Sequence, residues 1–248
     1  MSSQINGPKA GEAIRNSKVR ILQSIPPIKI EDCVLGQYKG YRNDSTITDK
    51  NTKTPTYAAL CCYINTPRWK GIPFIMTAGK ALKEQKVVIR IRFRESLNVP
   101  RILPGLKMGA NMLEIELQPK QSICMGTNIK TPGYSSLPIA KALELQYESM
   151  QLNEGNIYPD AYTRLLLDTL KGKQESFVRD DELIRSWEIF SPLLHKIDEL
   201  KIKPHIYERG SIGPIAAKIF ISRKTTQDLQ NNHHLRTPHT VTKIRSAL

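Results

Sequence analysis

A period-two alternation from Lys86 to Arg94 constrains the fold of this chain more than any other feature of its sequence. Apolar residues occupy every second position, and four of the intervening positions carry cations: Lys86, Arg90, Arg92 and Arg94. Successive side chains of a strand point to opposite faces of a sheet. The segment therefore predicts a β-strand with one apolar face, which lies on a core, and one basic face.

A second alternating segment, from Met112 to Gln118, carries Glu114 and Glu116 on its polar side. We expect the two segments to pair as antiparallel strands, because glutamates would then lie opposite arginines. Each such pair of opposite charges contributes about 0.2–1 kcal/mol to the stability of a sheet. The polar faces of both strands thus have a purely structural interpretation.

The remaining pattern combines strands and helices. Segments 33–39 and 56–64 are strand-like, and helices are predicted at 13–25, at 159–170 and from Asp180 onward. Apolar residues recur every three or four positions in the last helix, which predicts a stripe that faces a sheet: Leu183, Trp187, Phe190, Leu194 and Ile197. The order of elements favours an α+β fold, with one large, mainly antiparallel sheet and helices packed on one of its faces.

The chain shows no internal repeat and no clear linker. We expect a flexible N-terminus at 1–10, one domain at 11–221, and a disordered or loosely packed tail at 222–248. The tail is rich in Thr, Gln, Asn and His, and it has few apolar residues to bury.

Composition narrows the cellular context and the class of ligand. The four cysteines are expected to be reduced thiols, without a disulfide framework or a metal site, as is usual in the cytosol. No apolar run reaches the ~18 residues that a membrane-spanning helix needs, so we predict a cytoplasmic protein with no membrane partner. The net charge of +14 favours a phosphorylated ligand, because the cations are spread along the chain.

Three segments carry a resemblance to a known family. They are Cys33-Val34-Leu35-Gly36-Gln37-Tyr38, the run from Arg68-Trp69 to Gly79-Lys80-Ala81-Leu82, and the run from Pro159-Asp160-Ala161-Tyr162 to Ser191-Pro192-Leu193-Leu194-His195. In order and spacing they resemble the C-terminal domain of glucose-6-phosphate dehydrogenase, particularly its plant cytosolic form. This family oxidises glucose 6-phosphate with NADP in the pentose phosphate pathway. The resemblance implies an α+β domain whose sheet forms a dimer interface.

The resemblance also assigns candidate binding residues. Lys80 and Gln118 match residues that contact the substrate, and Lys86 and Arg90 match cations that hold the phosphate of a second, structural NADP. The family's glycine-rich coenzyme loop, its sugar-phosphate motif and its general-base histidine have no counterpart in these 248 residues. The resemblance therefore implies no catalytic residue here. We expect a truncated, catalytically incomplete relative that forms homo-oligomers, or hetero-oligomers with the full-length enzyme, through the sheet.

Departures from the family pattern fall in the same two ligand pockets. Thr77, Gln85 and Ile212 stand where the family has basic residues, and Glu116 replaces an arginine beside the structural NADP. A carboxylate at that position would repel a phosphate. Two alternative functions stay open: a fragment of an active enzyme, and a basic binding module for nucleic acid or a ribonucleoprotein.

Overall fold

The computed structural model describes residues 8–94, 109–130, 132–134, 138–147 and 160–231, which divide between two compact units. Unit 1 comprises the described parts of Met1–Lys83 and Ala161–Leu248, and unit 2 those of Glu84–Asp160. Each unit contains one four-stranded sheet. The α+β class with mainly antiparallel strands is confirmed, but the strands divide between two sheets where one large sheet was expected.

The sheet of unit 1 has the strand order β3-β2-β1-β8. Its strands are β1 (Cys33–Tyr38), β2 (Tyr57–Tyr63), β3 (Pro73–Gly79) and the short β8 (His205–Tyr207). β1 and β2 pair antiparallel with Val34 opposite Ala59, and β8 joins β1 in parallel with Gly36 opposite His205. The strands predicted at 33–39 and 56–64 are therefore confirmed, each to within about a residue.

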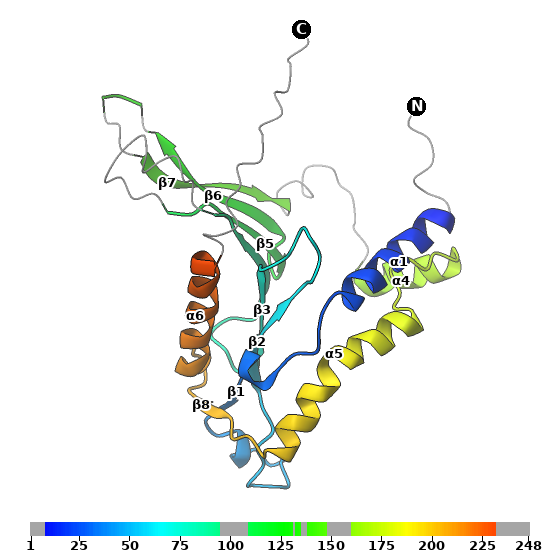
Figure 1. The fold of residues 1–248 in the computed structure, drawn as a ribbon, viewed down its shortest axis with the longest axis vertical. Helices are drawn as coiled ribbons and strands as arrows, with labels where there is room; N and C mark the ends of the chain where they lie inside the picture. Colours follow the sequence, from blue (N-terminus) through cyan, green and yellow to red (C-terminus); the bar gives the residue numbers. More distant parts are fainter. Residues whose placement is uncertain (1–7, 95–108, 131, 135–137, 148–159, 232–248) are drawn as a thin grey trace. The chain divides into compact units, whose positions relative to one another are not determined.

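Helices cover both faces of this sheet (Figure 1). Ala217 and Phe220 of α6 (Ile215–Asn231) share a core with Ala59 and Cys61 of β2. On the other face, α5 (Asp180–Glu199) packs its Ile189 and Leu193 against Cys62. Cys61 and Cys62 thus point to opposite faces, as strand geometry requires. The expectation of helices on one face alone was wrong, because α6 follows β8 and packs on the side opposite α5.

The buried face of α5 also differs from the predicted stripe. Ile189 and Leu193 are its buried residues, with Phe190 and Ile197 packed partly against them. Three members of the predicted stripe are exposed instead: Leu183, Trp187 and Leu194. The prediction of that stripe was therefore wrong for these three residues, because the sheet-facing side of the helix is rotated relative to them.

Polar contacts join α5 to α1 (Pro8–Gln23), the helix predicted at 13–25. The guanidinium of Arg185 donates to the carbonyl oxygens of Leu22, at 3.1 Å, and Ile25, at 2.8 Å. These carbonyls lie at the end of α1 and just after it, where a helix has no partners of its own. Arg185 therefore caps α1 and fixes it against α5.

The sheet of unit 2 is an antiparallel meander of order β4-β5-β6-β7. Its strands are β4 (Val87–Arg92), β5 (Met112–Gln118), β6 (Ser122–Lys130) and β7 (Pro138–Gln146). The predicted pairing of the two alternating segments is confirmed, with Arg90 opposite Glu114 and their side chains 2.5 Å apart as an ion pair.

The apolar face of β4 lies on no core among the described residues. Val87, Ile89, Ile91 and Phe93 are 42–48% exposed. Exposed apolar residues continue along the same sheet at Leu117, Leu143 and Leu145. The expected burial of this face is therefore not found, and the sheet presents a broad apolar surface.

The helix boundaries show two further features. α4 (Ala161–Leu170) ends as predicted before Gly172, whose φ is +67°, and Lys173 N–H donates to Asp168 O at 2.8 Å. Its expected first residue, Pro159, lies outside the described residues. α1 begins at Pro8 and α6 continues to Asn231, so helix extends past both predicted domain boundaries. No helix in the described part of the chain could cross a membrane.

Candidate functional site

Three glycines make room for two buried tyrosines beside the Lys80 segment. A Cβ built on Gly79 or on Gly213 would lie 2.6 Å from the Tyr57 ring, and one on Gly36 would lie 3.1 Å from both Tyr57 and Tyr207. The two rings meet edge to face, with centroids 5.7 Å apart. The loops that follow β3 and β8 can therefore approach the rings closely only because they carry glycine there.

A chain of hydrogen bonds runs from this tyrosine pair to Lys80. Tyr38 N–H donates to Thr56 Oγ1 at 3.0 Å, and Thr56 Oγ1 lies 3.0 Å from Tyr207 Oη. Tyr207 Oη is 2.7 Å from the carbonyl oxygen of Lys80. A hydroxyl has one proton, so Tyr207 donates to Lys80 and accepts from Thr56. Lys80 N–H in turn donates to Thr56 O at 2.8 Å, so the backbone N–H and the carbonyl of Lys80 are both hydrogen-bonded.

The residues after Lys80 are bound to the loop after β8. Ala81 has a φ of +52°, which is unusual for a residue with a side chain, and its carbonyl accepts from Gly210 N–H at 2.8 Å. Lys83 N–H donates to Ser211 O at 2.9 Å. The Lys80 side chain is exposed and has no polar partner among the described residues. Because hydrogen bonds fix the Lys80 backbone while its ammonium group has no partner among the described residues, Lys80 is suited to binding an anion.

The other predicted binding residues lie in unit 2. Gln118 is the last residue of β5 and is exposed, and a cis peptide bond joins it to Pro119. Lys86 forms an ion pair with Glu84 at 2.6 Å, and Arg90 is paired with Glu114. Both cations predicted to hold an NADP phosphate therefore already have carboxylate partners. Their roles stay predictions, as do those of Lys80 and Gln118.

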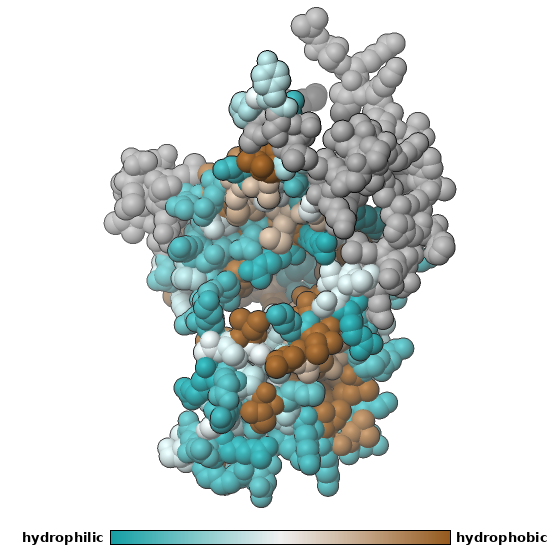
Figure 2. All heavy atoms as spheres, turned by 90° about the vertical axis from the view of Figure 1, so that its left-hand side faces the viewer, coloured by the Kyte–Doolittle hydropathy of each residue, from teal (hydrophilic) through white to brown (hydrophobic). Residues whose placement is uncertain are grey.

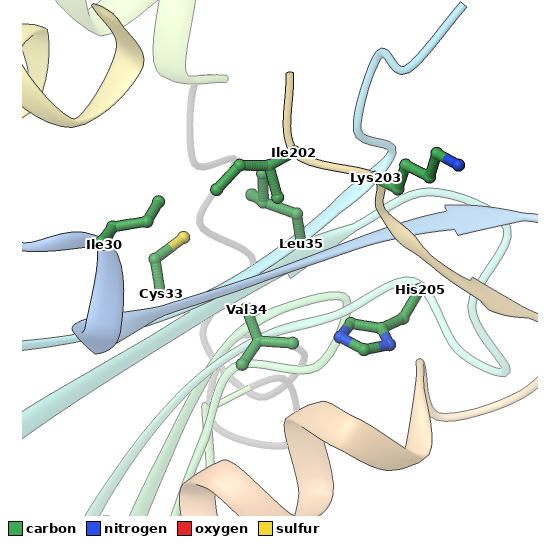
Figure 3. Close-up of a pocket in the computed structure, with 7 residues that line it drawn as sticks. All are labelled: Ile30, Cys33, Val34, Leu35, Ile202, Lys203 and His205. Carbon is green, nitrogen blue, oxygen red and sulfur yellow. The ribbon is translucent and has the colours of Figure 1, made fainter. Parts of the chain in front are cut away.

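A small cavity of about 100 Å³ lies beside β1 and the start of β8 (Figure 3). Cys33 and Leu35 point to one side of β1, whereas Val34 and His205 point to the other. Burial raises the pKa of the Cys33 thiol to about 11, so the thiol stays protonated at neutral pH. These residues do not form a nucleophile with a base beside it.

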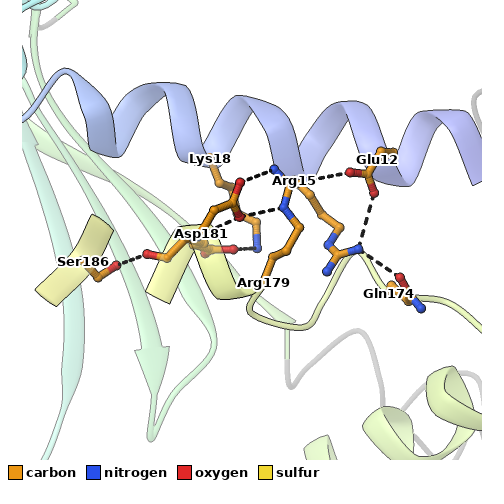
Figure 4. A network of polar contacts seen from close by, with 8 residues as sticks. Glu12, Arg15, Lys18, Gln174, Arg179, Asp181 and Ser186 are labelled. Atoms are coloured by element: carbon orange, nitrogen blue, oxygen red, sulfur yellow. Dashed lines mark hydrogen bonds and ion pairs between the residues drawn. The ribbon is translucent and has the colours of Figure 1, made fainter. Parts of the chain in front are cut away.

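A cluster of charges on α1 and α5 serves as a structural clamp (Figure 4). Arg179 binds Asp181 through two nitrogens, at 2.7 and 2.8 Å, and also pairs with Glu12. The hydrogen bond from Arg179 holds the pKa of Asp181 below its usual value. Arg15 donates to Gln174 at 2.9 Å, which ties α1 to the segment before α5. Most of these groups bind one another, although Arg15 Nε is buried without a hydrogen-bond partner among the described residues. The contacts between α1 and the α5 segment give the cluster a structural role.

Metal binding has no support in the described ranges, which hold no group of three His, Cys, Asp or Glu side chains placed to share an ion. The four cysteines are free thiols. Cys61 and Cys62 are buried on opposite faces of β2, and burial raises the pKa of Cys62.

Sequence reasoning missed Thr56 and Tyr207, which position Lys80. Tyr207 is 151 residues from Thr56 and 127 residues from Lys80 along the chain. No local pattern marks a contact of this separation. The glycines at 79 and 213 were visible in the sequence, but only the fold shows that both face one ring.

Comparisons with known proteins agree on one family. The family model "Glucose-6-phosphate dehydrogenase, C-terminal domain" matches residues 6–229. The chain is 46% identical over 207 residues to the cytoplasmic isoform of glucose-6-phosphate 1-dehydrogenase from Solanum tuberosum, covering 83% of this chain and 39% of that protein. It is 45% identical, over the same shares, to glucose-6-phosphate 1-dehydrogenase 5, cytoplasmic, from Arabidopsis thaliana.

A solved structure gives the same result in three dimensions. It is titled as glucose-6-phosphate dehydrogenase in complex with its substrate glucose-6-phosphate, and the TM-score is 0.79 at 35% identity. The match covers 86% of this chain and 45% of that one. The chain thus spans about two fifths of the length of the curated relatives that it matches.

Proposed function

Because this chain belongs to the glucose-6-phosphate dehydrogenase family through its C-terminal domain, we propose that it serves the NADP-dependent oxidation of glucose 6-phosphate in the cytoplasm. It supplies a substrate-binding lysine and an oligomerisation sheet, and it pairs with another subunit instead of catalysing the reaction alone. The isoforms from Solanum tuberosum and Arabidopsis thaliana that it resembles carry the name cytoplasmic. The observation that carries this proposal is the apolar face of the unit 2 sheet.

That face fits a subunit interface better than a solvent-exposed surface. β4 and Phe93, the residue just after it, present four apolar side chains, and Leu143 of β7 is 66% exposed. The two strands are the edges of one sheet, so the apolar surface extends across its whole width. Contiguous apolar surface of this extent marks protein–protein contacts in soluble proteins. The partner is a second copy of the chain or a full-length subunit of the family.

We expect Leu143→Asp to convert a dimer into a monomer. A carboxylate on this face would be buried without a partner in the dimer, and that burial costs several kcal/mol for an unpaired ion. Light scattering of the purified chain should give twice the 28.1 kDa mass of one copy for the unsubstituted protein. Ala142→Asp, one position along on the opposite face of β7, is the matched control and should stay dimeric. A monomeric unsubstituted chain would contradict self-pairing through this face.

The ligand part of the proposal rests on Lys80. Its ammonium group is free among the described residues, while Tyr207 and Thr56 hold its backbone. Glucose 6-phosphate supplies a phosphate, the anion that such a lysine binds by charge-assisted hydrogen bonds. NADP binding at Lys86 and Arg90 would first require both side chains to leave their carboxylate partners. We therefore propose stronger binding of the sugar phosphate than of NADP.

We expect Lys80→Gln to weaken glucose 6-phosphate binding by about 10- to 100-fold, since a hydrogen bond to a charged group is worth about 1.5–3 kcal/mol. Isothermal titration calorimetry with glucose 6-phosphate, and separately with NADP, measures both affinities. Lys83→Gln is the matched control, because Lys83 is also exposed, follows β3 and has no side-chain partner among the described residues. Equal losses in the two variants would assign binding to overall charge and not to Lys80.

The same titrations bear on the alternative that the chain is a fragment of an active enzyme. In that case, joining it to a coenzyme-binding domain of the family should yield NADP reduction that depends on Lys80. If the unsubstituted chain binds neither ligand but still dimerises, the sheet alone carries its function.

A further inference from the structure

The outward side of α6 is apolar and basic, which is unusual for a helix on a protein surface. Its inward side carries Ala217 and Phe220, which are buried against β2. Its outward side carries Ile215, which is 78% exposed, and Ile219, which is 56% exposed. Ile212, just before the helix, is 68% exposed. Figure 2 looks onto the side where α6 lies and shows apolar surface among hydrophilic surface.

The three isoleucines lie close together along the chain. Ile215 and Ile219 are one helical turn apart and therefore project from the same face. Ile212 precedes Ile215 by three residues and is exposed as well. Single exposed apolar residues are common, but a cluster on one face marks a contact surface. We call the surface formed by Ile212, Ile215 and Ile219 the α6 patch.

Cations flank the α6 patch without acidic neighbours in sequence. Lys218 and Arg223 are exposed on the same outward side and have no ion-pair partner among the described residues. No aspartate or glutamate occurs between Glu208 and Asp228. The surface therefore combines aliphatic side chains with uncompensated positive charge, and its ligand should combine apolar groups with negative charge.

We propose that the α6 patch is a peripheral docking surface for an anionic lipid bilayer. Aliphatic side chains insert at the boundary of headgroups and acyl chains, while lysine and arginine contact anionic headgroups. The patch is on the convex side of a helix, and a bilayer requires no matching groove. A nucleic acid is a poorer fit, because the patch has no aromatic side chain on which bases could stack. This proposal departs from the prediction of no membrane partner, which rested on the lack of a spanning helix, because a peripheral contact needs no such helix.

Vesicle co-sedimentation tests this surface on the full chain. We expect it to sediment with vesicles that mix phosphatidylglycerol and phosphatidylcholine, and not with phosphatidylcholine alone. Binding should weaken as salt rises, because salt screens the contribution of the cations. The double variant Ile215→Ser/Ile219→Ser should reduce binding at least tenfold, because two large aliphatic groups no longer insert into the bilayer.

A matched control is available on another helix of the same unit. Leu183 and Ile184 of α5 are 51% and 60% exposed, so Leu183→Ser/Ile184→Ser removes similar apolar surface elsewhere. This control should bind as the unsubstituted chain does, and circular dichroism should show both variants folded. Three results would overturn the proposal: no binding to the anionic vesicles, equal binding to neutral vesicles, or equal loss in the two double variants. A soluble acidic protein as the true partner would give the first result.

Discussion

Replacing Gly213 with alanine is expected to destabilise the protein by roughly 2–6 kcal/mol, from two separate causes. The φ of Gly213 is +104°, a conformation that costs a residue with a side chain about 1–3 kcal/mol. The new methyl group would also lie 2.6 Å from Tyr57, and overpacking of a filled core costs about 1–3 kcal/mol more. The two costs add, because a shift of the Tyr57 ring would relieve the close contact but would leave the unfavourable φ unchanged.

Gly210→Ala separates the two costs. Gly210 also has a positive φ, +77°, but a Cβ built there meets nothing within 4 Å. Urea denaturation followed by circular dichroism should show only the backbone cost of about 1–3 kcal/mol for Gly210→Ala, and a loss about twice as large for Gly213→Ala. Because Gly213 lies in the loop that binds the Lys80 segment, ligand affinity should fall along with stability. Equal losses in the two variants would mean that Tyr57 moves aside and that the close approach is unimportant.

Strands were predicted well from the sequence where a local alternation of apolar and polar residues marks them. The alternation at 86–94 and 112–118 set which residues share a face, and a one-residue shift would have moved every side chain to the other face. The observed pairing of Arg90 with Glu114 follows from that alternation together with opposite charge. Local periodicity was therefore sufficient for the pairing of β4 with β5, whereas β6 and β7 were not predicted from the sequence.

Periodicity could not show what covers each face. The apolar side of β4 was expected on a core because an apolar strand face normally lies on one, yet it is exposed among the described residues. The period of two gives the direction of a side chain and not the identity of its neighbour. The same limit applies to the helices, which lie on both faces of the unit 1 sheet.

The candidate site was predictable only in part. Lys80 was found by its motif, but the hydrogen bonds that hold it come from residues distant in sequence. Gln37 illustrates the same point: it is 1% exposed and donates to the carbonyls of Thr52 and Thr54, which anchors the loop between β1 and β2. A polar residue inside a strand gives no indication of these partners until the loop is placed.

The orientation of α5 was ambiguous in the sequence because apolar residues cover more than one side of the helix. Leu193 and Leu194 are neighbours about 100° apart around the helix axis, so a rotation of about that size exchanges their environments. The predicted stripe chose Leu194, whereas the structure buries Leu193 at 3% exposure and leaves Leu194 at 45%. The contacts of Ile189 and Leu193 with Cys62 and Ile28 decide the rotation.

Leu193→Ala should therefore destabilise the protein by about 2–5 kcal/mol, because it removes buried methyl groups and leaves a cavity beside the sheet. Leu194→Ala, the same substitution one position later, should cost less than about 1 kcal/mol, in the range of surface changes. Thermal unfolding followed by circular dichroism measures both, and a loss of this size lowers the melting temperature by about 2–4 °C per kcal/mol for a chain of this length. Because helix propensity changes equally in the two variants, their difference reports burial alone. A larger loss for Leu194→Ala would restore the predicted stripe and would require α5 to be rotated from its position in this structure.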